Sequence, residues 1–407
     1  MHQGIAALLG LQSWIVYRVE PGEGAIEVFV GKPRKEARCP VCGARTRRVH
    51  DRARRWRRVL HTWSGHRPVY LRVRPRRFRC GSCGKVFTEA FPGIRPWGRT
   101  TDYAEGVLLK QLAGRSFRST AYHLGVGVGT LRRLVLRRVR PQPDVSAVLP
   151  AVPEVTLSLD EHSFRHQDMA VTVTVVSPRR QVVALLPDDR VRTVEGFLRE
   201  WPDSARRRVR AVCVDLKDSW RKLVRRVLPH ASVVADPFHV IQDANRRVDE
   251  ARRVEQELCR RKIPRWPLLK NQEELTPKQA ETLRAIYRQY PTLAQFHWAK
   301  EQLRASYRAP TPAQAQTLLD RLLFFLQHAE DAELVRWGRT LRSWKAELWS
   351  YHQHRITSAY TEGIHTKIKL LKRLSYGFRN RHMYVRKMLL GLVPLALLLS
   401  PPHSLTY

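Results

Sequence analysis

The sequence predicts a multidomain α/β protein, with a metal-binding N-terminal segment, a short helical segment and a larger mixed domain. Two Cys-x-x-Cys-Gly motifs before residue 90 predict the first part. Amphipathic helical patterns after them predict the second. Strand-like apolar runs that alternate with helical patterns predict the third. The resulting boundaries are 1–98, 99–141, a Pro-rich linker at 142–153, and 154–407.

The chain is strongly basic. Its 74 Lys and Arg against 36 Asp and Glu leave a formal net charge of +38 over 407 residues. Neutralising nucleic-acid phosphates releases counterions, so double-stranded DNA is the partner that such a surface fits most simply. The longest apolar run, 388–400, contains Pro394 and is shorter than the roughly 20 residues of a membrane-spanning helix. No signal-peptide pattern begins the sequence, so we expect a cytoplasmic protein with no membrane partner.

Two cysteine pairs predict a zinc ribbon. Cys39 and Cys42 form the first pair, and Cys80 and Cys83 form the second. One tight turn aims both sulfurs of a pair at a single ion, and the following glycine relieves that turn. Four thiolates leave no open coordination position, so the expected Zn²⁺ is structural; the alternative is four unbound thiols. Two alternating segments that meet at Tyr70 are expected to form a hairpin between the pairs.

Residues 99–141 predict a helix-turn-helix. Thr101 or Asp102 caps a first helix, Ser116 caps a second, and a glycine-rich turn leads to a third. The third helix would read DNA in the major groove. Any small three-helix bundle shows the same pattern, which leaves a purely structural alternative. Basic side chains oppose the apolar face of the third helix, and we expect the first three to contact DNA: Arg132, Arg133, Arg137 and Arg138.

The second half of the chain follows a mixed α/β order. Three strand candidates between 155 and 186 are followed by a helical pattern. Two short apolar runs then end at Asp215 and Asp236, each followed by a helical pattern. This is the plan of a ribonuclease-H-like fold, and it places Asp160 and Asp215 on adjacent strands. Residues from about 246 to 350 predict a large helical insertion in that fold.

Three carboxylates, Asp160, Asp215 and Glu362, point to metal-dependent phosphodiester chemistry. Such cleavage needs an activated nucleophile and a neutralised leaving oxygen, and two Mg²⁺ ions (or Mn²⁺) provide both. Mg²⁺ prefers oxygen ligands and keeps several waters, so two or three carboxylates hold it. For any one of these acids taken alone, a surface cap is the alternative. Glu362 also begins a helical run whose basic residues suit DNA phosphates: Lys367, Lys369, Lys372 and Arg373.

At this point the chain resembles the ISL-three group of bacterial insertion-sequence transposases, which carry a zinc ribbon, a helix-turn-helix and a DDE domain in that order. The resemblance covers nearly the whole chain. It is carried by Cys-Pro-Val-Cys-Gly at 39–43, Arg-Arg-Phe-Arg-Cys-Gly-Ser-Cys-Gly at 76–84, Leu-Asp-Glu at 159–161, Val-Asp at 214–215, Ala-Asp-Pro-Phe-His-Val at 235–240, Thr-Glu-Gly-Ile-His-Thr-Lys-Ile-Lys-Leu-Leu-Lys-Arg at 361–373 and Tyr-Gly-Phe-Arg-Asn at 376–380.

The resemblance implies that Asp160, Asp215 and Glu362 are the catalytic metal ligands. It also implies that Asp236 and His239 form an accessory pair, although Asp236 remains an alternative to Asp215 as the second ligand. The group usually has Asn where this chain has His365.

The function that the resemblance implies is DNA transposition. The protein would bind the terminal inverted repeats of its insertion sequence, cleave DNA strands and transfer them into target DNA. Bringing two ends together implies a homodimer or a higher oligomer, associated with the bacterial nucleoid. Two alternatives stay open at this point: a catalytically silent DNA-binding regulator derived from a transposase, and a repair nuclease of the same fold.

Overall fold

The computed structural model describes residues 2–149 and 152–399. The chain divides into two compact units, which we call unit 1 (Met1–Pro143 with Ile368–Tyr407) and unit 2 (Asp144–Lys367). The sequence-based division kept 154–407 together, whereas the structure groups the C-terminal helices with the N-terminal segment. Part of the predicted linker, 150–151, lies outside the described residues.

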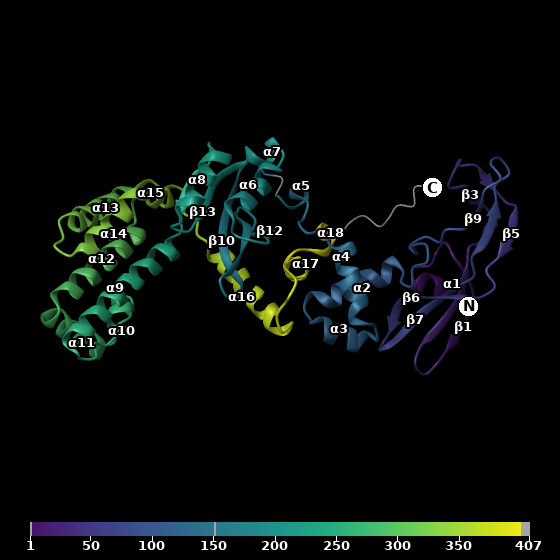
Figure 1. The fold of residues 1–407 in the computed structure, drawn as a ribbon, viewed down its shortest axis with the longest axis horizontal. Helices are drawn as coiled ribbons and strands as arrows, with labels where there is room; N and C mark the ends of the chain where they lie inside the picture. Colours follow the sequence, from purple (N-terminus) through teal and green to yellow (C-terminus); the bar gives the residue numbers. More distant parts are fainter. Residues whose placement is uncertain (1, 150–151, 400–407) are drawn as a thin grey trace. The chain divides into compact units, whose positions relative to one another are not determined.

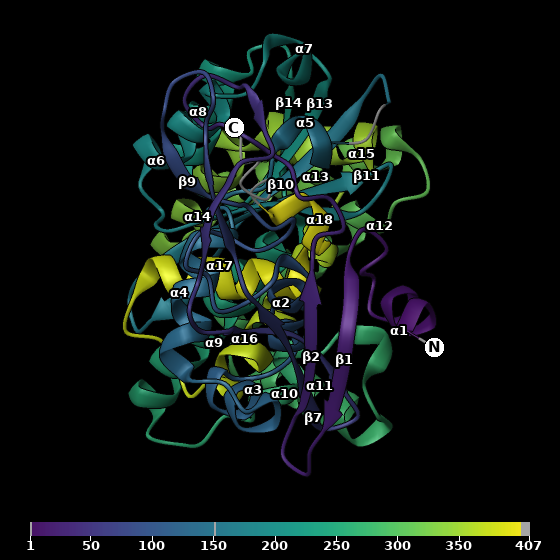
Figure 2. The same cartoon turned by 90° about the vertical axis from the view of Figure 1, so that its right-hand side faces the viewer.

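Unit 1 begins with helix α1 (His2–Leu8) and a four-stranded sheet in the order β1-β2-β7-β6. Figure 2 shows β1, β2 and β7 side by side. The predicted hairpin forms from the last two strands, but it turns after Ser64 and not at Tyr70, which lies inside β7. The strands are β1 (Ile15–Pro21), β2 (Ile26–Gly31), β6 (Arg57–Ser64) and β7 (Arg67–Val73).

Two small sheets frame the cysteine pairs. The first pair lies between two paired strands, and the second pair lies between the last two strands of a three-stranded sheet in the order β5-β8-β9. These strands are β3 (Ala37–Arg38), β4 (Arg45–Thr46), β5 (Val49–Arg52), β8 (Arg76–Arg79) and β9 (Val86–Thr88).

Helices complete unit 1. Thr101 and Ser116 accept backbone hydrogen bonds at the starts of α2 and α3, so of the two alternatives for the first cap Thr101 is the one observed, and the predicted Ser116 cap is confirmed. Near the C-terminus, α17 packs on α2 and α4, because its apolar side chains meet the buried leucines of those helices. The helices are α2 (Asp102–Ala113), α3 (Phe117–Leu124), α4 (Val128–Arg138), α17 (Arg381–Leu392) and α18 (Leu395–Leu398).

Unit 2 is built on a five-stranded sheet in the order β12-β11-β10-β13-β14. The first three strands form an antiparallel meander, and β13 and β14 extend the sheet in parallel, as the predicted element order requires. The central strands are buried on both faces, which explains their continuous apolar runs. They are β10 (Val155–Arg165), β11 (Asp168–Ser177), β12 (Gln181–Leu186), β13 (Val209–Val214) and β14 (Ser232–Ala235).

Helices connect these strands. Figure 1 shows α6 and α8 side by side next to the sheet, and contacts join α8 to both β13 and β14. Both helices have a strongly apolar face, and Val194, Leu198, Leu223 and Val224 are fully buried. The connecting helices are α5 (Val145–Val148), α6 (Val191–Arg199), α7 (Asp203–Arg206) and α8 (Asp218–Val227).

The predicted helical insertion follows β14, and it begins with the long helix that starts at Pro237. Its helices bury their own core around Trp337, Leu322 and Leu326 and return the chain to the sheet at α16 (Figure 1). They are α9 (Pro237–Cys259), α10 (Trp266–Leu269), the 3₁₀ turn η1 (Gln272–Glu274), α11 (Pro277–Gln289), α12 (Pro291–Arg308), α13 (Pro312–Gln327), α14 (Ala332–Ser343), α15 (Lys345–His354) and then α16 (Ala359–Leu374). Across the described part of the chain, none of the helices combines the length and apolarity needed to span a membrane.

Candidate active site and metal centres

Four cysteine sulfurs converge in unit 1. Cys39 Sγ lies 3.6 Å from Cys83 Sγ, and Cys42 Sγ lies 3.5 Å from Cys80 Sγ. All four sulfurs lie within 4.8 Å of one another. Backbone N–H groups of Cys83 and Ser82 lower the pKa of the Cys80 thiol to about 6, so this sulfur is a thiolate at neutral pH. The donor set fits a closed tetrahedral metal site, as predicted.

The two cysteine pairs have the same backbone geometry. In the first, Cys39 N donates to Ala44 O and Gly43 N donates to Cys39 O. In the second, Cys80 N donates to Lys85 O and Gly84 N donates to Cys80 O. Gly43 and Gly84 have φ values of +69° and +71°, a left-handed conformation that glycine adopts without strain. The glycine after each pair is therefore part of the site.

Four carboxylates and one imidazole converge in unit 2. Asp160 lies on β10, Asp215 and Asp236 directly follow β13 and β14, Glu362 lies in the first turn of α16, and His239 lies in the first turn of α9. His239 Nε2 is 3.0 Å from Asp215 Oδ1, 3.6 Å from Glu362 Oε1, 3.7 Å from Asp160 Oδ1 and 3.8 Å from Asp236 Oδ2. All five side chains identified from the sequence thus meet at one place.

Strand register explains this convergence. Leu159 pairs with Val214, and Val214 pairs with Ala235. The next residue along the chain is in each case an aspartate, so Asp160, Asp215 and Asp236 lie at the same level of the sheet. Asp160 is not the last residue of β10. The strand continues to Arg165 as one arm of a hairpin with β11, and Asp160 is consequently only 2% exposed.

Asp236 and Asp215 have different surroundings. Asp236 is 1% exposed and accepts hydrogen bonds from Ser358 N (3.0 Å) and Ser358 Oγ (2.7 Å). Its two oxygens therefore tie the segment before α16 to the end of β14. The Asp215 side chain is 26% exposed and faces His239. Asp215 therefore has more of its carboxylate available to an added ligand than Asp236 has.

The electrostatics of this cluster are unbalanced. Within the described part of the chain, no Lys or Arg forms an ion pair with Asp160, Asp215 or Asp236. Burial raises the pKa of Asp215, an effect that His239 opposes and Asp160 reinforces. Burial lowers the pKa of His239, but the Asp160 and Asp215 carboxylates outweigh it and raise that pKa to about 11. The imidazolium therefore supplies positive charge that a divalent cation would otherwise bring.

The ligand atoms form two groups that fit divalent cations. Asp160, Asp215 and His239 form one group, and Asp160, Glu362 and His365 form the other. Within each group the ligand atoms lie within 4.8 Å of one another, and Asp160 belongs to both. Among the described residues, no hydrogen bond reaches the buried Asp160 Oδ2. A buried carboxylate oxygen without a donor is costly, and a cation would satisfy it.

Sequence reasoning missed a buried polar chain behind Asp160. Thr172 Oγ1 lies 3.1 Å from His162 Nδ1 and 3.0 Å from His365 Nε2, and His365 Nδ1 lies 3.6 Å from Asp160 Oδ2. The available signal was strand periodicity, because His162 is two residues after Asp160 and lies on the same face of β10. Thr172 pairs directly with Asp160 across the hairpin.

The residue beside Asp160 has a separate role. Glu161 accepts hydrogen bonds from Lys217 Nζ (2.5 Å) and Trp220 Nε1 (2.9 Å). Neighbouring side chains on a strand point to opposite faces, so this carboxylate binds α8 and its preceding loop and stays out of the cluster.

The basic residues predicted to contact DNA fall into two groups. On α4, Arg132 and Arg133 are exposed, whereas Arg137 donates to the buried Glu105. The outward orientation predicted for Arg138 is wrong, because this side chain is 5% exposed and pairs with Asp102 and Glu105. On α16, Lys372 is partly buried, and three predicted side chains are exposed: Lys367, Lys369 and Arg373.

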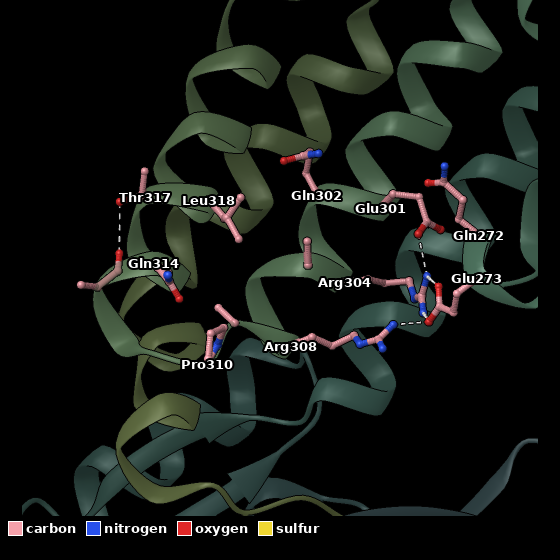
Figure 3. A pocket seen from close by; sticks show the side chains of 13 residues that line it. Gln272, Glu273, Glu301, Gln302, Arg304, Arg308, Pro310, Gln314, Thr317 and Leu318 are labelled. Atoms are coloured by element: carbon pink, nitrogen blue, oxygen red, sulfur yellow. Dashed lines mark hydrogen bonds and ion pairs between the residues drawn. The ribbon is translucent and has the colours of Figure 1, made fainter.

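A separate cavity of about 900 Å³ lies between α12 and α13, and Figure 3 shows its lining. Arg304 pairs with Glu273 and Glu301, and Arg308 pairs with Glu273. Because its arginines are neutralised by the chain's own carboxylates, this cavity lacks the open charge of the cluster around Asp160.

Comparison with known families decides the identity of the chain. The transposase family of ISL3 DDE domains matches residues 157–388, which is more than half of the chain. The zinc-finger family of the transposases IS204/IS1001/IS1096/IS1165 matches residues 35–83. The chain belongs to the ISL3 transposase family. The two matched spans contain the carboxylate cluster and the four cysteines.

Curated relatives of this ISL3 family member are similar over most of their length. The chain is 26% identical over 397 residues to the transposase for insertion sequence element IS1001 of Bordetella parapertussis, covering 94% of this chain and 96% of that protein. It is 25% identical over 408 residues to the transposase for IS1557 of Mycobacterium tuberculosis, covering 89% and 87%. Among solved structures, the Drosophila P element transposase strand transfer complex matches with a TM-score of 0.42 and 12% identity, covering 72% of this chain and 92% of that one, a level that supports no functional argument.

Proposed function

We propose that this transposase binds the terminal inverted repeats of its own insertion sequence, cleaves DNA strands there and joins them to target DNA. The observation that carries the proposal is the convergence of Asp160, Asp215 and Glu362 from three elements around the imidazole of His239. Carboxylates that cluster in this way are suited to divalent cations, and these cations promote phosphodiester cleavage and transfer.

In this proposal Asp160, Asp215 and Glu362 are the catalytic ligands, and Asp236 is a positioning residue. Support for that division comes from hydrogen bonding, because both Asp236 oxygens are occupied by Ser358. A bound Mg²⁺ or Mn²⁺ supplies the Lewis acid that activates the attacking hydroxyl and neutralises the leaving oxygen. The ribonuclease-H-like arrangement is supported by the strand order of unit 2.

The DNA would be held by two basic surfaces. On α16, Lys367, Lys369 and Arg373 are exposed on the helix that carries Glu362, where they suit phosphates next to the reacting bond. In unit 1, α2 to α4 would act as the helix-turn-helix, with Arg132 and Arg133 reading or positioning DNA.

Arg137 in unit 1 would not contact DNA directly, because its side chain donates to Glu105.

A structural Zn²⁺ at the four cysteines would stabilise the fold of the N-terminal segment. Because two transposon ends must be joined together, the active form would be a homodimer or a higher oligomer.

The test uses DNA that carries the gene's own flanking repeats, with Mg²⁺ or Mn²⁺. Wild type should cut and join this DNA, while Asp160→Ala, Asp215→Asn and Glu362→Gln should bind it and lose cleavage by about 10³-fold or more. Glu154→Gln, which changes an exposed acid outside the cluster, is the matched control.

Two other outcomes would change the proposal. If wild type binds the repeats and never cuts them, the protein is a DNA-binding regulator. If Asp215→Asn cuts normally while folded Asp236→Asn does not, Asp236 is the second ligand. Titrating the ends with protein and measuring the mass of the complex tests the expected oligomer.

A further inference from the structure

We propose that His365 is a direct metal ligand, so that the Asp160–Glu362–His365 group is a mixed carboxylate and imidazole site that favours Mn²⁺ over Mg²⁺. This inference rests on the proposed function and specifies which cation that site selects. It does not follow from the three acids, because they alone would make an all-oxygen site.

Asp160, Glu362 and His365 lie close enough together to bind one ion. One ligand atom from each of Asp160, Glu362 and His365 lies within 4.8 Å of the other two, which is the spacing of ligands around one ion. Asp160 is 2% exposed and His365 is 3% exposed. His365 Nδ1 lies 3.6 Å from Asp160 Oδ2, an oxygen that accepts no hydrogen bond within the described residues. An ion bound beside His365 Nδ1 would satisfy this Asp160 oxygen.

Hydrogen bonding to Thr172 determines which nitrogen of the His365 imidazole carries the proton. Thr172 has one hydroxyl hydrogen and lies between His365 Nε2 at 3.0 Å and His162 Nδ1 at 3.1 Å. If Thr172 donates its hydrogen to His162, it accepts the N–H of His365 Nε2. The lone pair of His365 is then on Nδ1, which is the atom that faces Asp160 and the ligand group. Metal-binding histidines are oriented in this way by a hydrogen bond to the other ring nitrogen.

The surroundings hold that arrangement in place. His162 and Thr172 are buried at 5% and 0% exposure, on the two strands of the β10–β11 hairpin. The rings of His162 and His365 lie 4.9 Å apart. His365 therefore has little freedom to turn away, and the site is formed before any cation binds.

Ligand chemistry then predicts the preference. Mg²⁺ favours oxygen ligands and keeps most of its waters, so an imidazole adds little to its binding. Mn²⁺ also binds carboxylate oxygens, and its affinity for imidazole nitrogen, although the lowest in the first-row divalent series, exceeds that of Mg²⁺. A buried imidazole in the ligand group should consequently raise the affinity for Mn²⁺ relative to Mg²⁺. A purely carboxylate site would not produce this difference.

The experiment is calorimetric titration of the zinc-loaded full-length protein with Mn²⁺ and with Mg²⁺. We expect His365→Asn to weaken Mn²⁺ binding by about tenfold and to change Mg²⁺ binding by less than about twofold. His166→Asn is the matched control, because His166 is exposed on the same hairpin with a φ of +45°, which asparagine tolerates. Its binding of both ions should equal that of wild type. Melting curves establish that the variants are folded, and His365→Gln provides a second variant if His365→Asn is not.

Pulsed electron paramagnetic resonance of bound Mn²⁺ gives a readout that is independent of activity. Wild type should show modulation from coordinated nitrogen, and this modulation should weaken in His365→Asn. In His239→Asn the contribution of His365 should remain. Superimposable spectra of wild type and His365→Asn, or an unchanged ratio of Mn²⁺ to Mg²⁺ affinity, would overturn the proposal.

The two proposals can fail separately. A protein that cuts its repeats while His365→Asn keeps the wild-type ion ratio retains the transposase function and loses the His365 assignment. A protein that binds Mn²⁺ through nitrogen yet never cuts DNA retains the assignment and loses the function.

Discussion

Buried carboxylates in the two units have opposite surroundings. In unit 1, Glu105 is 1% exposed and lies within ion-pair distance of Arg95, Arg137 and Arg138. In unit 2, Asp160 is 2% exposed, and its ion-pair partners in the described part of the chain are imidazoles. The first acid has more positive charge from its own chain than it needs, and the second has too little.

The difference separates acids that hold a fold together from acids that await a ligand. Burying a charge is unfavourable unless the charge is paired. The ionised Glu105 carboxylate is tolerated in the core because arginines of the same chain lie next to it. In the proposed site, the unfavourable energy of burying the Asp160 cluster would remain until a cation bound. Buried acids in a strongly basic chain are thus informative about function only when their nearest cations are known.

Zinc removal should have the largest effect. The four cysteine sulfurs resemble the Asp160 cluster in needing an external cation, and structural zinc contributes on the order of 10 kcal/mol to a small domain. Chelation, or Cys80→Ser, should unfold the segment around residues 35–89 and reduce specific DNA binding. Zinc content, circular dichroism and gel shift measure this. Cys259→Ser, which changes a cysteine outside the group, should behave as wild type; an unchanged melting curve after chelation would contradict the structural role.

Glu105→Gln should be the next largest. It leaves Arg137 without its anion and removes one of the two carboxylates that pair with Arg138, so we expect a loss of about 3–5 kcal/mol in the free energy of unfolding. Denaturant melts measure it, with exposed Glu20→Gln as the control, for which less than about 1 kcal/mol is expected. Mn²⁺ binding in unit 2 should not change. Equal stability of the two variants would show that the arginines around Glu105 are not needed as partners.

Lys387 is a buried cation without a carboxylate partner among the described ion pairs, so it extends the comparison of buried charges from acids to bases. It is 0% exposed, donates to Ala113 O at 3.2 Å, and burial lowers its pKa from 10.5 to about 8. Keeping it protonated at pH 7 therefore costs about 3 kcal/mol. Lys387→Met should melt at a higher temperature than wild type at pH 7, whereas exposed Lys110→Met should not.

The pH dependence fixes the sign of that prediction. Between pH 8 and 10.5 the unfolded chain binds the proton and the folded chain does not, so wild-type stability should rise with pH. The advantage of Lys387→Met should shrink over this interval and vanish above it. An advantage that stays constant from pH 7 to 11 would assign it to packing.

The smallest effect should come from Asp215→Asn without added divalent cations. Removing one charge from a cluster of like charges should stabilise the protein by about 1 kcal/mol, or a rise in melting temperature of about 2–4 °C. Adding Mn²⁺ should reverse the order, because wild type gains a ligand that the variant binds poorly. If Asp215→Asn destabilises the protein as Glu105→Gln does, the two clusters are alike and the comparison fails.

Local patterns predicted the parts of the site that depend on neighbours in sequence. The spacing of Cys39 and Cys42 fixes a turn, and the apolar run before Asp215 fixes a strand, so both were identified correctly as elements. Side-chain direction was harder. Arg138 lies on the basic side of α4 in the sequence pattern, yet it is buried because Asp102 and Glu105 on α2 attract it.

Features that depend on distant partners were not predicted. Apolar spacing marks α17 as buried, but it does not identify α2 and α4 as the helices that it packs against. The Thr172 hydroxyl has no signature on its own strand, because its partners His162 and His365 come from two other elements. Ser358 likewise has its role only because the fold brings it next to Asp236, which is 122 residues earlier in the sequence.

The helical insertion also delays the synthesis of Glu362 relative to that of Asp215. Glu362 follows Asp215 by 147 residues, most of them in the insertion helices. At 5–20 residues per second a ribosome adds Glu362 roughly 7–30 s after Asp215. A nascent or prematurely terminated chain can therefore contain the four cysteines, helices α2 to α4, Asp160 and Asp215, and still lack Glu362. It also lacks α17, which packs on α2 and α4, so on the proposed function neither the DNA-binding helices nor the cleavage site would be complete in such a chain.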